Sequence, residues 1–195
     1  MLKRLIGRFK RPKFAVIQEY FFYSALTEQG LPAERIEIDH HSGRCWSSET
    51  GWLPMTFPMS LVERVAGISK EKSIDYFFRG VVSPGRDWLN SYSGVEESRF
   101  GRRKSTKFTV DHDYYCRLSA ARFGLAPVGS CPWSYRFFES ILCWAMPVLG
   151  SHDHDLYASD FNFLRDGEDH RYDVSKCEEN YQMMIDRHTL KNFKG

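Results

Sequence analysis

The stretch FGLAPVGSCPWSYRFFESILCWAMPVL, residues 123–149, decides the fold predicted for this chain. Its apolar run at residues 124–128 is short and bounded by glycines, which is typical of a buried parallel strand. After a glycine-containing loop, apolar residues recur at helical spacing at Trp133, Phe137, Ile141 and Trp144. We expect Pro147 to end this helix and residues 148–149 to begin the next strand. The stretch therefore predicts one strand–helix–strand crossover of a parallel sheet.

Strands and helices are expected to alternate on both sides of this stretch. The predicted strands are residues 73–82, 108–110 and 161–164, and the predicted helices are residues 113–123 and 177–192. Such alternation favours an α/β fold with a Rossmann-like parallel sheet and flanking helices. Before it, the apolar run at residues 14–23 predicts a first buried strand.

The length of the chain restricts its domain organisation. Two complete Rossmann halves together need about 250–400 residues, and this chain has 195. We therefore predict a Rossmann-like domain over residues 73–195 and an abbreviated N-terminal region over residues 1–72.

Basic residues are distributed unevenly along the chain. Six of the 27 lysines and arginines, and none of the 25 acidic residues, lie in the first 13 positions. The rest of the chain therefore carries a net charge of −4, which argues against a nucleic-acid-binding protein. Residues 1–13 also place apolar side chains on one face of a predicted helix, so this segment is a candidate for contact with an anionic membrane surface. A solvated terminus is the alternative.

Cysteine usage and hydropathy indicate the compartment. The five cysteines are odd in number and form no Cys-x-x-Cys pair, so neither a disulfide framework nor a zinc site is expected. No apolar run approaches the roughly 18 residues of a membrane span, and the N-terminus lacks the continuous apolar segment of a signal peptide. These features predict a cytoplasmic protein. Contact with a membrane surface through residues 1–13 remains an open alternative to a purely cytoplasmic location.

Ligands of parallel sheets bind at the carboxyl ends of the strands. Gly129 and Ser130 follow a predicted strand there, and the next helix begins with backbone N–H groups and a positive dipole end that favour an anion. Arg86 follows a Pro-Gly turn after another predicted strand, so it should project from the same edge. A guanidinium can bind a diphosphate through two parallel hydrogen bonds. For Arg86, a plain surface position is the alternative.

The same part of the chain resembles a known family. The residues that carry the resemblance are Pro127, Gly129, Ser134, Arg136, Glu139, Pro147 and Val148. This pattern of strand, Ser-x-Arg-x-x-Glu and Pro-Val is similar to the nucleotide-sugar-binding half of exostosin-like glycosyltransferases. The segment FFRGVVSPGRDWL, residues 77–89, also resembles the family's strand followed by Gly-Arg. The chain departs from the family at Trp144 and Ala145, where the family has a small Gly-Cys pair.

The resemblance implies a fold, a reaction and a donor site. The fold is the C-terminal half of a GT-B glycosyltransferase, and the reaction moves a sugar from a nucleoside diphosphate sugar to a glycan hydroxyl. Inversion at the anomeric carbon is implied, with no metal and no cofactor besides the nucleotide sugar. The implied donor-binding residues are Arg86, Gly129, Ser130, Ser134, Arg136 and Glu139. Glu139 would hold both ribose hydroxyls, and its alternative is a solvated helix residue paired with Arg136.

An inverting transfer needs a base that accepts the proton of the acceptor hydroxyl. Asp39 and His41 are the candidates, because the resemblance implies that the N-terminal region faces the acceptor. Polar residues of a surface loop are the alternative. The run His152-Asp153-His154-Asp155 has residue types that suit a metal, but no second cluster accompanies it, so no metal site is predicted.

A second function remains open at this point. The chain could be a non-catalytic half-domain that binds a nucleotide sugar or glycan and needs a partner chain. The short N-terminal region favours this alternative, whereas the Arg and Glu motif favours an enzyme.

Overall fold

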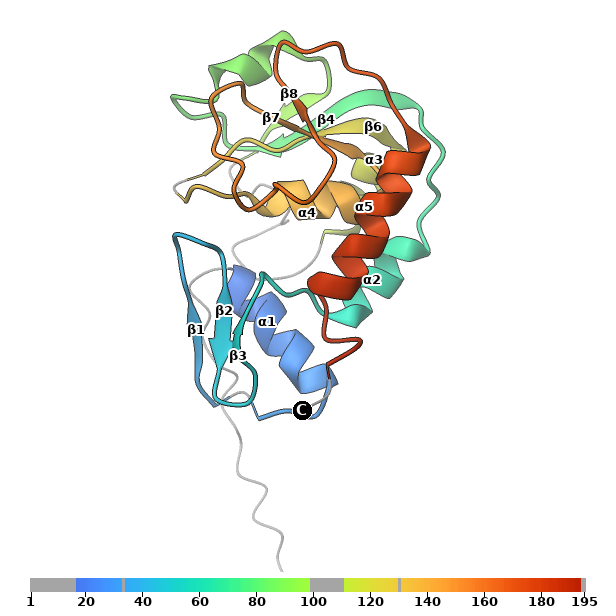
Figure 1. Ribbon diagram of the computed structural model, residues 1–195. Coiled ribbons are helices and arrows are strands. Elements are labelled where there is room, and N and C mark those ends of the chain that lie inside the picture. The colour runs from blue at the N-terminus through green and yellow to red at the C-terminus, as the bar shows by residue number, and fades with distance from the viewer. Residues whose placement is uncertain (1–16, 33, 99–110, 130, 194–195) are drawn as a thin grey trace, which may run out of the picture.

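Within the residues that the structure describes, a five-stranded parallel sheet forms the upper part of the molecule in Figure 1. The computed structural model describes residues 17–32, 34–98, 111–129 and 131–193. The sheet has the order β5–β4–β6–β7–β8, with the respective bounds Val95–Glu97, Ile74–Gly80, Ala121–Leu125, Met146–Leu149 and Leu164–Arg165. The predicted α/β fold with a parallel sheet and flanking helices is therefore confirmed, and its general arrangement is Rossmann-like.

Helices cover one face of this sheet. They are α2 (Met59–Ala66), α3 (His112–Ala120), α4 (Tyr135–Leu142) and α5 (Val174–Arg187). α3 and α4 pack directly on the strands, and α2 and α5 pack against α4. Phe77 and Phe78 of β4 point to opposite faces, as successive residues of a strand do. Phe77 joins the core under the helices, and Phe78 packs with Leu89 of the short 3-10 helix η1 (Asp87–Ser91).

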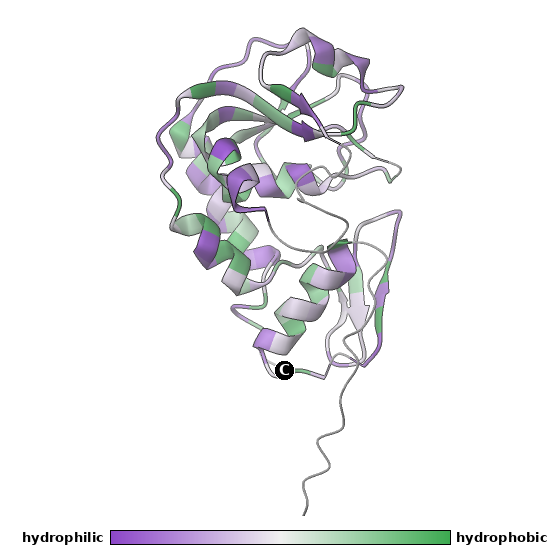
Figure 2. Cartoon of the chain, turned by 180° about the vertical axis from the view of Figure 1, so that it is seen from behind, coloured by the Kyte–Doolittle hydropathy of each residue, from purple (hydrophilic) through white to green (hydrophobic). Residues whose placement is uncertain are grey.

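The first described residues, from α1 to β3, form a smaller layer on the far side of the helices. α1 (Ile17–Glu28) lies beside an antiparallel sheet of the order β1–β2–β3, with bounds Ile36–Ile38, Cys45–Ser47 and Gly51–Leu53. One buried cluster connects this layer to α4, because the Phe57 ring contacts both Phe21 and Phe138. α2 buries Leu61, Val62 and Val65, and Figure 2 shows hydrophobic and hydrophilic residues interspersed along the helices. None of the described helices combines the length and apolar character that crossing a membrane requires.

The prediction of a strand at residues 14–23 is wrong. Residues 17–23, the part of this run that the structure describes, belong to helix α1. The buried residues of α1 are Gln18, Phe21, Phe22, Ala25 and Leu26, at the spacing of one helical face. The buried face of this helix includes the polar Gln18, so apolar residues alone do not reveal the helical spacing. Its amide is buried and donates to the carbonyl of Gly43 at 2.6 Å, a contact made by tertiary structure.

The predicted boundaries around β6 are also displaced. The strand is Ala121–Leu125 rather than residues 124–128, and it follows α3 without a loop. The predicted helix at residues 113–123 therefore ends at Ala120. The strand predicted at residues 108–110, Ser130 and the cationic segment 1–13 lie outside the described residues.

Helix α4 ends earlier than predicted, and Pro147 is not the cause. The N–H groups of Trp144 and Ala145 donate to the carbonyls of Ile141 and Ser140, which is the Schellman pattern of a helix end. Trp144 has a φ of 57°, in the left-handed region that glycine occupies most readily. Trp144 thus lies beyond the helix instead of on its apolar stripe, and Pro147 lies inside β7.

Candidate functional site

The carboxyl ends of β4 and β6 form the topological switch point of the sheet. β5 lies on one side of β4 and β6 on the other, so the connections from these strands run in opposite directions. In sheets of this order, ligands bind where the loops after the two strands separate. Here residues 81–86 follow β4 and residues 126–129 follow β6. These two loops and the first turn of α4 make up the candidate donor site.

Arg86 connects the two loops. Its Nε donates to the carbonyl of Val128 at 2.9 Å, and its Nη1 donates to the carbonyl of Val81 at 2.9 Å. A Cβ atom at Gly129 would lie 3.3 Å from Nη2, so glycine allows the loop to approach the guanidinium closely. Burial lowers the pKa of Arg86, and the neighbouring Asp153 carboxylate acts in the opposite direction. Arg86 therefore places a positive charge at the switch point.

Arg136 lies in the first turn of α4, at the end of β4. Its Nε and Nη2 donate to the carbonyl of Arg79 at 3.3 and 3.1 Å, and its guanidinium lies 4.9 Å from the ring centroid of Phe78. A Cβ atom at Gly80 would overlap this guanidinium. Ser134 is the N-cap of α4, where its hydroxyl accepts from the backbone N–H of Arg136 at 3.3 Å. The Ser134 side chain thus stabilises the first turn of α4, the turn that would face a bound diphosphate.

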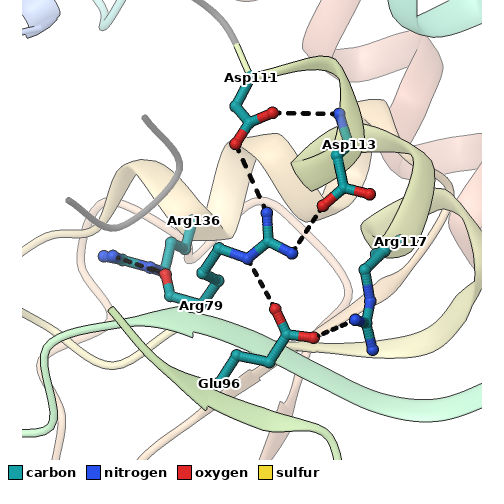
Figure 3. A network of polar contacts seen from close by, with 6 residues as sticks. All are labelled: Arg79, Glu96, Asp111, Asp113, Arg117 and Arg136. Carbon is teal, nitrogen blue, oxygen red and sulfur yellow. Dashed lines mark hydrogen bonds and ion pairs between the residues drawn. The ribbon is translucent and has the colours of Figure 1, made fainter. Parts of the chain in front are cut away.

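Arg79 belongs to a charged network (Figure 3) whose members are not recognisable as a group in the sequence. Its guanidinium contacts Glu96 at 2.7 Å, Asp113 at 2.8 Å and Asp111 at 3.6 Å, and Glu96 also pairs with Arg117. Only 13% of the Arg79 side chain is exposed. Three carboxylates surround this cation, so it joins β5 and α3 to β4 and is a poor candidate for binding a diphosphate.

Glu139 is the main correction to the predicted site. Its exposed fraction is 0%, so the alternative of a solvated helix residue is wrong. The hydroxyls of Tyr115 and Tyr114 donate to its carboxyl oxygens at 2.6 and 3.2 Å. Both tyrosines come from α3, which packs across this side of α4. In this arrangement the carboxyl is enclosed by protein, and a ribose does not reach it.

Asp153 and Asp155, in the run at residues 152–155, stabilise the loop after β7 through contacts with other parts of the chain. Asp153 accepts hydrogen bonds from the backbone N–H groups of Gly150 at 2.9 Å and Val128 at 3.3 Å, which links this loop to the one after β6. Asp155 pairs with Arg165. Across the described residues, no group of three or more His, Cys, Asp or Glu side chains is arranged to hold a metal ion.

Asp39 and His41 lie in the turn between β1 and β2, which faces the carboxyl-edge loops in Figure 1. Trp133, in the segment that leads into α4, donates from Nε1 to the carbonyl of His40 at 2.9 Å. Within the turn, the Asp39 carboxylate accepts from the Ser42 hydroxyl and from the backbone N–H of His41. These hydrogen bonds lower the pKa of Asp39 below its ordinary value, the one from Ser42 most. Asp39 is therefore a weak candidate for a base.

His41 faces a pocket that three segments of the chain build together. The cavity has a volume of about 370 Å³, and its lining residues are His41, Ser42, Pro132, His154, Leu156 and Tyr157. They come from the β1–β2 turn, the segment before α4 and the loop after β7. Leu156 is 81% exposed and gives the pocket an apolar rim. The structure thus brings two histidines from distant parts of the sequence to one cavity beside the predicted donor loop.

Trp133 has a role that its sequence pattern does not indicate. Its ring lies in the core, as its helical spacing suggests, but it precedes α4, and its Nε1–H fixes the β1–β2 turn. A buried indole N–H needs an acceptor, and this requirement is the only signal in the sequence for such a role.

A scan against protein-family models finds no family that matches this chain, and a search of curated proteins finds no match. Function is therefore inferred from the carboxyl edge of the sheet and the adjoining pocket.

Proposed function

We propose that this chain is a GT-B-type glycosyltransferase that moves a sugar from a nucleoside diphosphate sugar to a glycan hydroxyl. The observation that carries the proposal is the hydrogen bond from Trp133 to the carbonyl of His40. It ties the turn that bears His41 to the segment between Gly129 and Ser134, whose ends belong to the predicted donor loop and the first turn of α4. The turn that bears His41 is thereby tied to the segment that leads into α4, whose first turn carries Arg136.

On the donor side, two guanidinium groups and a helix N-terminus favour a diphosphate. Arg86 lies at the switch point and Arg136 in the first turn of α4, where the helix dipole is positive. As the glycosidic bond breaks, negative charge accumulates on the leaving diphosphate, and fixed positive groups stabilise it. This charge complement supports transfer without an essential metal, so activity is expected to persist in the presence of a chelator.

On the acceptor side, His41 is the proposed general base. Its imidazole accepts the proton of the glycan hydroxyl while the hydroxyl oxygen forms a bond to the anomeric carbon, and the nucleoside diphosphate leaves from the opposite face. The result is a glycoside of inverted configuration. Leu156 and Tyr157 line the same pocket, and their apolar surfaces can pack against the C–H face of a sugar ring.

A second candidate is a half-domain that binds a nucleotide sugar without turnover. One observation favours it: the Asp39 carboxylate, one of the two candidate bases, is engaged by hydrogen bonds within its own turn. In this case a partner chain would supply the base and part of the acceptor site.

The test begins with thermal unfolding of the protein in the presence of nucleotides and nucleotide sugars, since a ligand of the folded state raises the melting temperature. Donor hydrolysis and transfer are then measured with the stabilising donor. We expect His41→Ala to reduce turnover by about 10²- to 10⁴-fold, the usual contribution of a general base, and to leave nucleotide affinity unchanged. We expect Arg86→Met to weaken binding of the nucleoside diphosphate by about ten- to hundredfold.

The matched control is His152→Ala, which alters an exposed histidine of the loop after β7 that does not line the pocket. Full activity of His41→Ala would remove His41 from the mechanism. Nucleotide binding without turnover would favour the half-domain. Absence of stabilisation by every nucleotide tested would contradict both functions.

A further inference from the structure

A pocket at the opposite edge of the sheet contains a cysteine and a histidine. Its volume is about 540 Å³, and it is lined by the connection from α2 to β4 and by the outer side of α3. Ser73 and Ala120 of the lining precede β4 and β6, so the pocket lies at the amino ends of the strands. It is therefore separate from the candidate donor site at the carboxyl ends.

The chemistry of this pocket is concentrated on one face of α3. His112 and Cys116 are four residues apart, so both project from the same side of the helix. The Cys116 sulfur lies 3.4 Å from Nε2 of His112, within hydrogen-bonding distance for sulfur. Glu71 is the other titratable residue that lines the pocket, and the Nζ of the neighbouring Lys70 donates to the Val65 carbonyl at 2.6 Å and to the Ser119 hydroxyl at 3.2 Å. The Nε2 atom of His112 is therefore placed to accept the thiol proton of Cys116.

We propose that Cys116 is a site of thiol–disulfide exchange with small disulfides, and that His112 assists the exchange. His112, with its proton on Nδ1, accepts the thiol proton at Nε2. The Cys116 thiolate attacks one sulfur of the small disulfide, a new S–S bond forms, and the disulfide's own S–S bond breaks. The departing thiolate takes the proton back from His112. Cys116 is oxidised to a mixed disulfide, and one half of the small disulfide is reduced.

Two observations favour Cys116 over the other cysteines as the site of exchange: the adjoining pocket, and the burial of three of the other thiols. A cavity of this size is typical of small-molecule sites, so it can hold the half that stays attached to Cys116. Cys45, Cys143 and Cys177 are buried, and burial raises the pKa of these thiols to about 11, 12 and 11. Cys131 is half-buried like Cys116, and it serves as the internal reference.

The test uses oxidised glutathione with the full chain and measures the modification rate of each cysteine by peptide mass spectrometry at pH 8 and pH 6.5. An unassisted thiol loses about 20-fold in rate over this interval, because its thiolate fraction falls in proportion. We expect Cys131 to follow this loss and Cys116 to lose less than about fivefold. In the His112→Gln variant we expect Cys116 to show the full loss and Cys131 to be unchanged.

Two outcomes would overturn the proposal. The first is an equally steep loss at Cys116 and Cys131 in the unmodified chain, a comparison that needs no variant to fold. The second is a shallow loss at Cys116 that persists in His112→Gln, which would exclude His112 as the assisting group. The inference does not depend on the proposed glycosyltransferase activity, since modification is read directly from peptide masses.

Discussion

His188 joins the end of α5 to the N-terminal layer, and its protonation should make the protein unstable in mild acid. Its Nδ1 lies 2.7 Å from the carbonyl of Met55, its own carbonyl accepts from the N–H of Phe57 at 2.7 Å, and its ring packs 4.6 Å from that of Phe138. Burial lowers the pKa of His188 from 6.5 to about 4. The folded protein therefore holds a neutral imidazole at a pH where the unfolded chain binds a proton.

The size of the effect follows from this difference in pKa. Between pH 6.5 and pH 4 the unfolded state binds more protons at this site than the folded state, so the free energy of unfolding falls as the pH falls. Each pKa unit corresponds to about 1.4 kcal/mol, which gives roughly 3 kcal/mol over the whole window and about 2 kcal/mol by pH 5. Above pH 6.5 the site contributes no pH dependence.

Urea unfolding at pH 7, 6 and 5 would measure this dependence in the unmodified chain and in His188→Gln. The glutamine amide can still donate to the Met55 carbonyl but does not titrate, so the variant should lose about 2 kcal/mol less between pH 7 and 5. His152→Gln, which removes an exposed histidine, is the control and should behave like the unmodified chain. If His188→Gln keeps the full pH dependence, the neutral, buried state of His188 is refuted.

Three further predictions test the packing of the fold and its N-terminus. Gly124→Ala should lower the free energy of unfolding by about 1–3 kcal/mol, because the added Cβ would overlap a serine side chain of α4; Gly67→Ala, whose Cβ has ordinary contacts, is the control in the same urea titration. Tyr115→Phe should cost about 1–3 kcal/mol by the same measurement, because it removes a donor from the buried carboxyl of Glu139, and an unchanged stability would contradict this contact. Deletion of residues 1–13 should weaken sedimentation with anionic liposomes and leave nucleotide binding unchanged, and equal sedimentation of both proteins would exclude a membrane role for these six cations.

Local patterns in the sequence determined the class of fold and one edge of the site. Alternating apolar segments predicted a parallel sheet with helices, because the periods of strand and helix are properties of consecutive residues. The position of Arg86 at the carboxyl edge could also be predicted, since it depends only on the strand and turn that precede it. The N-cap role of Ser134 is local in the same way.

Tertiary structure decided which polar side chains are enclosed and which segments meet. Glu139 belongs to a recognisable motif, but its burial depends on two tyrosines of α3, more than 20 residues away. The turn that bears His41 is held by Trp133, across a separation of 93 residues. Helix α1 was mistaken for a strand because the partner of its buried Gln18 lies in another segment. Sequence periodicity records which residues are apolar, whereas the burial of a polar side chain depends on a distant partner that satisfies its hydrogen bonds.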